Sequence, residues 1–310
     1  MKVALGIDIG GTAVKAGVFS TEGTLLAKTS FSSREPADEP AYLRIARGID
    51  AFLVEAGISS EEVSGIGIDV PGPVDSAGHA GVLPNLELDV EALRQAIRDL
   101  FPQANLVVVN DANAAALGER WQGAARDVDS FALVAIGTGV GGGLVADGQL
   151  VAGAFGAGGE FGHLIVNRDE AELCGCGRPG HLEQYASATG IVRAYLRECE
   201  KHGTAPVSLD GPTDTLSVFA ACRAGDEAAQ QAIAAMADYL GFALAQVSVV
   251  ADPSLYLIGG GVSAGWDLFG DALQSAFQSY CFKSCRPARI APAALGNDAA
   301  LYGSAYLALE

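Results

Sequence analysis

Two histidines and two cysteines lie close together in the sequence, in a pattern that suits metal binding. They are His163, Cys174, Cys176 and His181. Four nitrogen and sulfur ligands at such short spacings are typical of a closed tetrahedral zinc site. The alternative is that both cysteines are free thiols and His181 is an ordinary surface residue. The spacing favours a structural Zn²⁺ ion.

The turn Gly10-Gly11-Thr12, which follows Asp8 and precedes Lys15, could bind phosphate. Two adjacent glycines let backbone amides point at phosphate oxygens without a Cβ in the way. Thr12 can add a hydroxyl donor, and Asp8 could hold Mg²⁺ through water. The alternative is a plain hairpin turn beside a hydrogen-bonded aspartate.

Two further glycine clusters occupy similar positions at the ends of apolar runs. Gly137-Thr138-Gly139 joins two expected strands, and Gly260-Gly261 follows one apolar strand and precedes a helix. A strand and a turn follow the first cluster, whereas a dinucleotide-binding fingerprint requires a helix there. We therefore expect the first cluster to bind phosphate, and the second to let a flat ring or ribose lie against the backbone.

Asp111 stands between an apolar strand at 106–109 and an alanine-rich helix at 112–122. Phosphoryl transfer to an alcohol needs a carboxylate near the attacking hydroxyl, and a strand end is a rigid place from which to aim it. An aspartate at this point could equally cap the helix. The residue types alone leave both interpretations open.

The elements that would position these residues form two similar halves. Strands expected at Val3–Ile9, 13–19 and 24–29 form one meander, and strands at 130–136, 140–146 and 149–152 form another. Each meander carries a Gly-Thr turn between its first two strands, which predicts a repeated architecture. The other expected elements are helices at 40–57, 90–101, 112–122, 215–224, 227–250 and 266–280, and strands at 63–70, 106–109 and 255–258.

The composition excludes several classes of protein. The 310 residues suffice for about two domains. With 19 Lys and Arg against 37 Asp and Glu, the net charge is −18, so we expect no nucleic-acid partner. We find neither a signal peptide nor an uncharged apolar run long enough to span a membrane, and we expect a cytoplasmic protein without a membrane partner.

The order and spacing of these motifs resemble the ROK family of sugar kinases and repressors, within the actin-like, hexokinase and Hsp70 ATPase superfamily. The resemblance covers nearly the whole chain and is strongest to zinc-containing bacterial glucokinases. It rests on Asp8-x-Gly10-Gly11-Thr12, Asn110-Asp111-Ala112-Asn113-Ala114, Gly137-Thr138-Gly139-x-Gly141, Gly159-Glu160-Phe161-Gly162-His163, Cys174-x-Cys176-Gly177 and Gly259-Gly260-Gly261-Val262.

The resemblance implies a two-domain α/β fold of the actin-like ATPase (ribonuclease H-like) type, with a cleft between the domains. We expect a small domain at 1–112, on which a C-terminal helix at 298–310 packs. A large domain at 113–297 would carry the zinc loop. The family's usual Cys-x-Cys-Gly-x-x-Gly-Cys pattern ends in histidine here, at His181.

The implied activity is that of an ATP:hexose 6-phosphotransferase, with ATP, Mg²⁺ and structural Zn²⁺ as cofactors and Asp111 as the base. Glucose is the first choice of substrate; fructose, mannose and N-acetylated hexosamines are alternatives. A sugar-responsive repressor is a further alternative, but we find no DNA-binding segment ahead of the first strand. Relatives are commonly homodimers or homotetramers. The resemblance assigns the sugar site to Gly72, Asn85, Asn110, Asp111, Glu160, His163 and Glu183.

Overall fold

The computed structural model describes residues 2–34, 39–75, 77–81, 83, 86–209 and 211–310, which divide into two compact units. The first unit comprises 1–127, 149–158 and 297–310, and the second comprises 128–148 and 159–296. The boundary expected from the sequence falls at residue 112, whereas in the structure the helix α3 (Asp111–Gln122) groups with the first unit. Asn85 lies outside the described residues.

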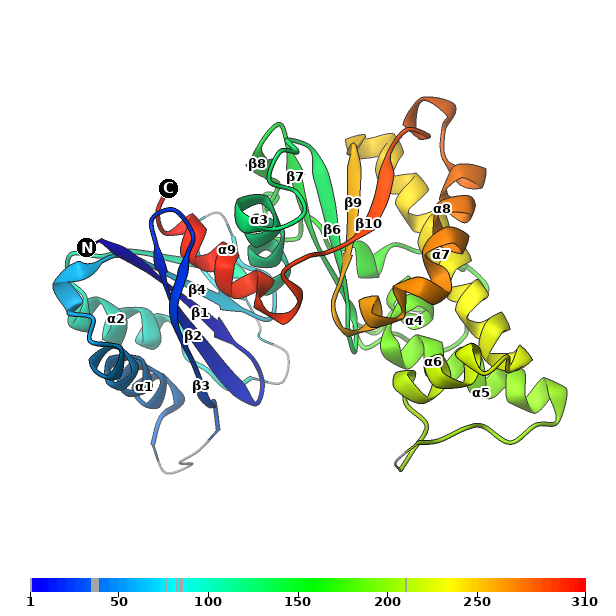
Figure 1. Ribbon diagram of the computed structural model, residues 1–310, viewed down its shortest axis with the longest axis horizontal. Helices are drawn as coiled ribbons and strands as arrows, with labels where there is room; N and C mark the ends of the chain where they lie inside the picture. The colour runs from blue at the N-terminus through cyan, green and yellow to red at the C-terminus, as the bar shows by residue number, and fades with distance from the viewer. Residues whose placement is uncertain (1, 35–38, 76, 82, 84–85, 210) are drawn as a thin grey trace. The chain divides into compact units, whose positions relative to one another are not determined.

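Two five-stranded sheets have the same strand order (Figure 1). With the strands of each sheet counted in chain order, the first is antiparallel to the second and parallel to the fourth. This common order confirms the repeated architecture that the two meanders predicted. The first sheet runs β3 (Leu25–Ser32), β2 (Ala13–Ser20), β1 (Val3–Ile9), β4 (Val63–Val70), β5 (Asn105–Asn110), and the second runs β8 (Gln149–Leu150), β7 (Val140–Ala146), β6 (Phe131–Ile136), β9 (Leu255–Gly259), β10 (Arg289–Pro292).

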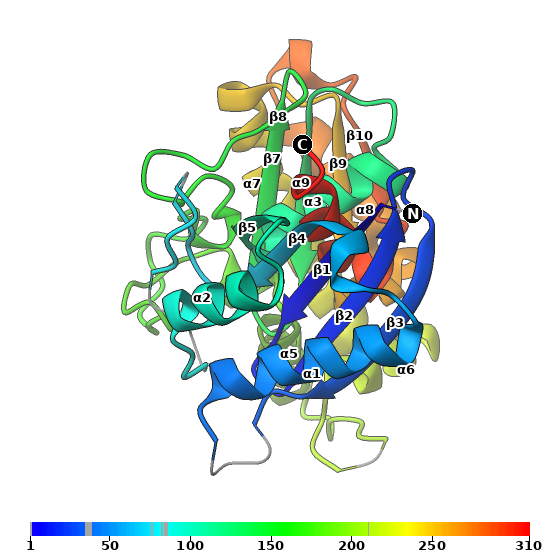
Figure 2. The same cartoon turned by 90° about the vertical axis from the view of Figure 1, so that its left-hand side faces the viewer.

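The first sheet is covered on both faces. Helices α1 (Ala41–Ala56) and α2 (Val90–Leu100) lie on one face, and α3 and α9 (Ala299–Leu307) lie on the other (Figure 2). Successive residues of a strand point to opposite faces. Accordingly Leu5 and Ile7 pack in the core beneath α1 and α2, whereas Ala4 packs against Leu301 of α9.

Glycine allows α9 to lie directly on the strands and on α3. A Cβ atom at Gly67 would overlap the backbone of Ser304, and one at Gly303 would overlap the backbone of Ala114. Only a residue without a side chain fits at such close backbone approaches. The face of β4 that carries Gly67 also carries Asp69, two residues further along the strand.

Helices of the second unit pack on its sheet around one long central helix. The surrounding helices are α4 (Glu183–Ala186), α5 (Ala188–His202), α6 (Thr215–Arg223) and α8 (Trp266–Tyr280). The central helix is α7 (Glu227–Ala251), whose Leu240 and Leu244 are fully buried with Ile258 of β9. Among the described residues α7 alone is long and apolar enough to span a membrane, and more than half of its apolar stretch is buried inside the protein.

Helix α5 and strand β10 of the second unit were not predicted, and neither was the four-residue helix α4. Helix α5 begins at a Ser187 cap, and its buried Ile191, Tyr195 and Cys199 follow helical spacing, which a closer inspection of the pattern would have found. Strand β10 is four residues long, ends in Pro292 and lies at the sheet edge. Its assignment depends on pairing with β9, which no local pattern reveals.

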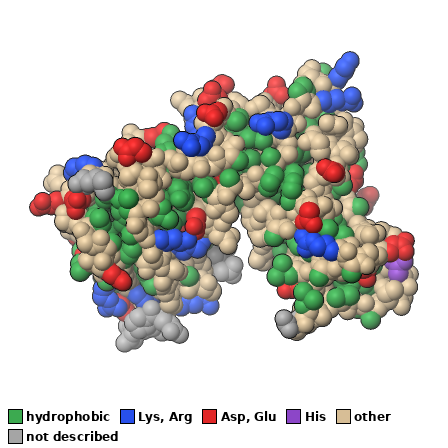
Figure 3. All heavy atoms as spheres, in the orientation of Figure 1, with side chains coloured by type: hydrophobic (Ala, Val, Ile, Leu, Met, Phe, Trp, Pro, Cys, Tyr) green, Lys and Arg blue, Asp and Glu red, His purple; other side chains and the backbone are tan. Residues whose placement is uncertain are grey.

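The face shown in Figure 3 carries both signs of charge. Lys and Arg atoms are scattered among Asp and Glu atoms there, without a continuous basic band in the described part of that face.

Candidate active site and metal centre

Asp111 is the first residue of α3, and the residues before and after it in the chain both donate hydrogen bonds to its carboxylate. Its Oδ1 accepts hydrogen bonds from Asn110 Nδ2 at 3.0 Å and from the Ala112 amide at 2.8 Å. The helix cap is Asn110, whose Oδ1 accepts from the Asn113 amide at 3.0 Å. The alternative that Asp111 is the cap is therefore wrong by one residue. Asp111 is left half-buried at the helix start, positioned by its neighbour.

Asn110 also fixes the adjoining glycine turn. Its Nδ2 donates to the carbonyl of Gly72 at 3.0 Å, and the Asn110 side chain is almost fully buried. Gly72 has a φ of 121°, in a region that glycine adopts without strain. The structure thus brings together Gly72, Asn110 and Asp111, three of the residues expected to bind sugar.

The turn at Gly10-Gly11-Thr12 connects β1 to β2, and a charged pair lies beside it. Lys15 Nζ is 2.8 Å from Asp8 Oδ2 and donates to the carbonyl of Asn297 at 3.0 Å. Partial burial opposes the Lys15 charge, but the hydrogen bond and the negative charge of Asp8 together raise the pKa of Lys15. Lys15 is therefore a cation beside the glycine turn at neutral pH.

Arg34, which the sequence analysis missed, also lies at this turn. Its Nε donates to the Gly11 carbonyl at 2.7 Å. A second guanidinium or ammonium group beside a glycine turn adds to its attraction for anions. Because Arg34 follows β3 and shares no motif with Gly11, no sequence pattern indicated this contact.

Asp69 is a second residue that the sequence analysis missed. It is fully buried, and neither carboxylate oxygen has a hydrogen-bond partner among the described residues. In the sheet it is the register partner of Asp8 on β1 and of Val109 on β5. Burial, followed by the negative charges of Asp8 and Asp111, raises the pKa of Asp69 well above its ordinary value. Burial and the two neighbouring carboxylates therefore favour the protonated form of Asp69.

In the second unit, the expected nucleotide turns occur where the sequence placed them. Gly137-Thr138-Gly139 connects β6 to β7, and a Cβ at Gly137 would meet open space. Gly260 follows β9 with a φ of 77°, and Gly261 opens a short 3₁₀ helix, Gly261–Gly265, ahead of α8. A Cβ at Gly260 would overlap the backbone of Ile136, so the two turns are adjacent in space.

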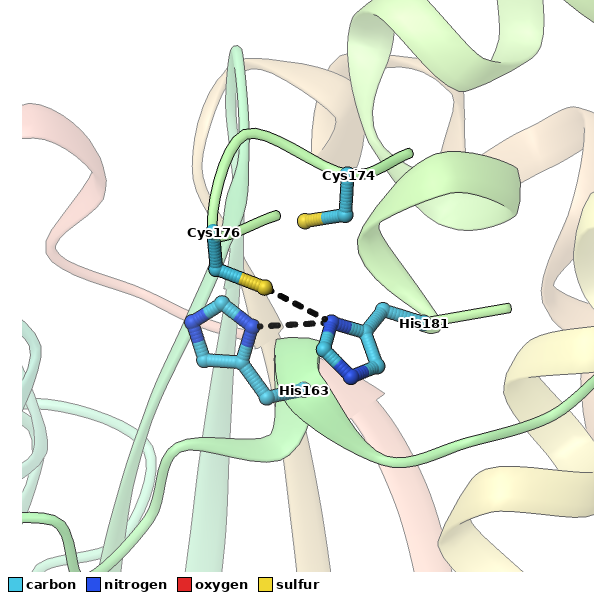
Figure 4. A group of neighbouring side chains, drawn as sticks. All are labelled: His163, Cys174, Cys176 and His181. Carbon is cyan, nitrogen blue, oxygen red and sulfur yellow. Dashed lines mark hydrogen bonds between the residues drawn. The ribbon is translucent and has the colours of Figure 1, made fainter. Parts of the chain in front are cut away.

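The four expected metal ligands converge in the second unit (Figure 4). Their donor atoms all lie within 4.8 Å of one another. His181 Nδ1 is 3.3 Å from His163 Nδ1 and 3.2 Å from Cys176 Sγ. Tetrahedral zinc with Zn–N and Zn–S bonds of about 2.0 and 2.3 Å needs donor separations of roughly 3.3–3.8 Å. The residues present therefore fit a zinc ion.

The protonation of this cluster also suits a metal. Burial, followed by the charge of His163, lowers the pKa of His181, so its ring is neutral and can act as a ligand. Burial raises the pKa of the Cys174 thiol to about 11, so this thiol loses its proton at neutral pH only when a cation replaces it. His163 faces the cluster with Nδ1, and its Nε2 lies 3.9 Å from Glu160 Oε2.

Glu183 links the metal cluster to a glycine turn. Its Oε1 accepts from Cys174 Sγ at 3.3 Å, and its Oε2 accepts from the Val140 amide at 3.2 Å, next to Gly139. A Cβ at Gly139 would overlap the Glu183 carboxylate. Glu183, expected only as a sugar ligand, thus also fixes the position of the metal loop relative to β7.

The loop before the cysteines is anchored to α5. Arg193 donates to Glu172 Oε2 and to the Gln184 carbonyl, both at 2.6 Å. Gln184 in turn accepts from the His181 amide at 3.1 Å and donates to the Glu172 carbonyl at 2.9 Å. This network was not predicted, because its members are ordinary polar residues spread along the chain.

Comparison with known proteins identifies the family. A ROK family model matches residues 4–310. A glucokinase from Halalkalibacterium halodurans is 33% identical, over 98% of this chain and 94% of its own. A ROK family glucokinase from Streptomyces griseus, solved in complex with glucose and AMPPNP, is 34% identical with a TM-score of 0.77, over 98% of both chains.

A ROK hexokinase from Thermus thermophilus is 31% identical with a TM-score of 0.82, over 98% of this chain and 97% of its own. Together with the repeated α/β sheets, these likenesses confirm the actin-like ATPase fold class. The chain belongs to the ROK family.

Proposed function

We propose that this protein is an ATP-dependent hexose kinase, with glucose as the first choice of substrate, which forms hexose 6-phosphate and ADP. Its glucokinase relatives and the glucose- and AMPPNP-bound structure support this activity. Asp111 carries the proposal, because its carboxylate is fixed at the start of α3 while Asn110 performs the capping. A carboxylate held in this way can accept the proton of an attacking sugar hydroxyl.

The same proposal assigns the other residues. Gly72, Asn110 and Asp111 of the first unit, and Glu160, His163 and Glu183 of the second unit, hydrogen-bond sugar hydroxyls; the assignment of Asn85 stays a prediction from the sequence. Carboxylates and amides can each pair with neighbouring hydroxyls. The nucleotide is assigned to Asp8, Gly10, Gly11, Thr12, Lys15, Gly137, Thr138, Gly139, Gly260 and Gly261.

Two metal ions are part of the proposal. Mg²⁺ would accompany ATP and offset the charge of the transferred phosphoryl group. Zn²⁺ would be held by His163, Cys174, Cys176 and His181, and its role is structural. With Nδ1 of His163 on the metal, Nε2 is left to bind a sugar hydroxyl beside Glu160.

The direct test is a coupled ADP-release assay across glucose, fructose, mannose and N-acetylated hexosamines. We expect the highest kcat/KM with glucose. Absence of sugar-dependent ADP release with every hexose would refute the kinase assignment, and a higher kcat/KM with another hexose would change only the substrate.

We further propose a cytoplasmic homodimer or homotetramer, which light scattering on the purified full chain would test. A monomer at micromolar concentration would contradict this proposal.

A further inference from the structure

The two Gly-Thr turns that the proposed function assigns to the nucleotide share a pattern of hydrogen bonds. In the first unit, the carbonyl of Gly11 accepts a hydrogen bond from Arg34 Nε at 2.7 Å. The next carbonyl, that of Thr12, accepts from the Ser33 amide at 3.2 Å. Ser33 and Arg34 directly follow β3, so one short segment binds two consecutive carbonyl groups of the turn.

The turn of the second unit has the same pattern with different donors. The Gly137 carbonyl accepts from the Ala188 amide at 2.8 Å. The Thr138 carbonyl accepts from Thr189 Oγ1 at 3.2 Å. Ala188 and Thr189 are the first two residues of α5. The donors differ in type and in place in the sequence, yet they bind the equivalent two carbonyls, which indicates that both turns need these carbonyls fixed.

Binding of a carbonyl group also sets the direction of the amide that follows it. A peptide group is planar and trans, so its C=O and N–H bonds point in opposite directions. The Thr12 N–H therefore points away from Arg34, and by the same argument the Thr138 N–H points away from Ala188. Both threonines are exposed, and neither amide has a hydrogen-bond acceptor among the described residues. Turn amides left unpaired in this way are the donors of anion-binding sites.

Arg34 is the charged donor in this pattern, and a buried residue fixes the segment that carries it. A hydrogen bond from a guanidinium group is stronger than one between neutral groups. Arg44 of α1 is 7% exposed, and its Nη2 donates to the Ser33 carbonyl at 2.5 Å. Helix α1 thus holds the segment from which Arg34 reaches the turn.

The carboxylates near this contact do not compete for Arg34. Glu39 and Glu87 line the same cavity as Gly11 and Arg34. Glu39 Oε2 lies 2.7 Å from Arg47 Nη2, and Glu87 is exposed. Neither carboxylate forms an ion pair with Arg34 within the part of the chain that the structure describes. The guanidinium group therefore stays on the Gly11 carbonyl.

We propose that Arg34 is a positioning residue for the phosphoryl donor. Its bond to the Gly11 carbonyl orients the Gly11–Thr12 peptide group so that the Thr12 amide donates to a phosphate oxygen of ATP. A glycine turn can adopt many backbone conformations, and Arg34 selects the one that binds phosphate before the nucleotide arrives. This inference rests on the proposed kinase function, and it assigns Arg34 no part in proton transfer.

Calorimetric titration with Mg·AMPPNP and, separately, with glucose tests the selectivity of this role. In Arg34→Ala we expect AMPPNP affinity to fall by about tenfold or more, because a hydrogen bond to a charged group is lost and the turn is freed. Glucose affinity should stay within about twofold. Arg47→Ala is the matched control, since it removes the same charge from an exposed arginine of α1 that pairs with Glu39, and it should bind AMPPNP as the wild type does.

Nuclear magnetic resonance of the Thr12 amide separates positioning from direct contact between Arg34 and phosphate. On addition of Mg·AMPPNP to the wild type, the Thr12 and Thr138 amide protons should both shift downfield, as expected for new bonds to phosphate oxygens. In Arg34→Ala saturated with AMPPNP, the Thr12 shift should be lost while the Thr138 shift is retained. Arg34→Met keeps the aliphatic stem of the side chain and should behave as Arg34→Ala does.

Thermal unfolding verifies that each variant is folded before titration. The proposal is overturned if folded Arg34→Ala and Arg34→Met bind AMPPNP as tightly as Arg47→Ala. It is also overturned if the Thr12 amide proton does not respond to nucleotide, or responds equally in the wild type and in Arg34→Ala. These readouts require no turnover of sugar, so such results leave the kinase assignment intact, whereas absence of sugar-dependent ADP release by the wild type refutes that assignment alone.

Discussion

The two units hold their candidate functional side chains by different means. In the first unit Asp111 lies at the junction of β5 and α3, and short hydrogen bonds from Asn110 and Ala112 fix its carboxylate. In the second unit His163 lies on a short 3₁₀ turn, and Cys174 and Cys176 lie on a loop outside any helix or strand. Regular backbone positions one set of residues, and side-chain contacts position the other.

The comparison teaches where each site is vulnerable. Backbone hydrogen bonds of the sheet and of α3 persist whatever ion is present, so the geometry at Asp111 is intrinsic to the fold. Most residues of the loop 164–182 are exposed or half-buried, and Glu183 and the Arg193–Glu172 network hold it, together with the zinc ion proposed above. We expect metal loss to disorder the second site and leave the first intact.

Removing the base should have the largest effect. In Asp111→Asn we expect kcat to fall by about 10²–10⁴-fold, because no carboxylate accepts the hydroxyl proton. Glucose affinity, measured by calorimetry, should stay within a few-fold, since Asn110 keeps its cap and its bond to Gly72. Turnover close to that of the wild type would exclude Asp111 as the base.

Removing zinc should have an intermediate effect that is confined to the second unit. Chelation should raise KM for the sugar by roughly tenfold or more, and hydrogen exchange should rise across 160–183 but not across 105–122. Cys176→Ser should lower the zinc content, whereas the matched Cys222→Ser, outside the cluster, should retain about one zinc per chain. A zinc-free preparation with full activity would contradict the structural role of zinc. Hydrogen exchange that rises equally in both segments would show that metal loss affects the two units alike.

Asp69 should have the smallest effect on activity and a distinctive effect on stability. Its folded-state pKa lies above its unfolded value, so the folded protein keeps a proton that the unfolded chain releases. The carboxyl group therefore costs stability increasingly as the pH rises above about 4 toward the folded pKa. Asp69→Asn removes this dependence and mimics the neutral acid.

We expect Asp69→Asn to unfold at nearly the wild-type temperature near pH 4 and to be more stable by about 1–3 kcal/mol near pH 7. Its kcat should stay within a few-fold of wild type, in contrast to Asp111→Asn. Thermal unfolding across this pH range checks the expectation. A stability difference that stays constant with pH would show that Asp69 is ionised in the folded protein.

Much of the fold followed from local patterns. The strand Val63–Val70 and the helix Trp266–Tyr280 were predicted to the residue, because apolar runs with the correct period end there at proline or at a change of pattern. The order of the glycine turns was also correct, and the four expected metal ligands lie together, as the spacing predicted. Each of these features depends on residues that are close together in the sequence, so sequence patterns can predict it.

The remaining features depend on contacts between distant segments. In the sequence, Asp69 is a polar residue near the end of an apolar strand, where it could equally be exposed. In the structure it is buried, because α9 packs on the same face of β4. The alternation Gly65-Ile66-Gly67-Ile68-Asp69 did indicate that Asp69 shares a face with two glycines. Whether Asn110 or Asp111 caps α3 is a one-residue distinction, which sequence patterns do not resolve.

The close packing of α9 against β4 and α3 has a consequence for biosynthesis. The first unit is encoded in separate stretches, the last of which is 297–310, while the second unit ends at residue 296. A ribosome therefore synthesises the entire second unit before it synthesises α9, which packs on one face of the first sheet. Until residues 297–310 emerge, α3 lies on this face without α9, and the glycine-lined stretches of β1 and β4 stay open to solvent and to other chains. The half of the protein that is translated first is the half that is completed last.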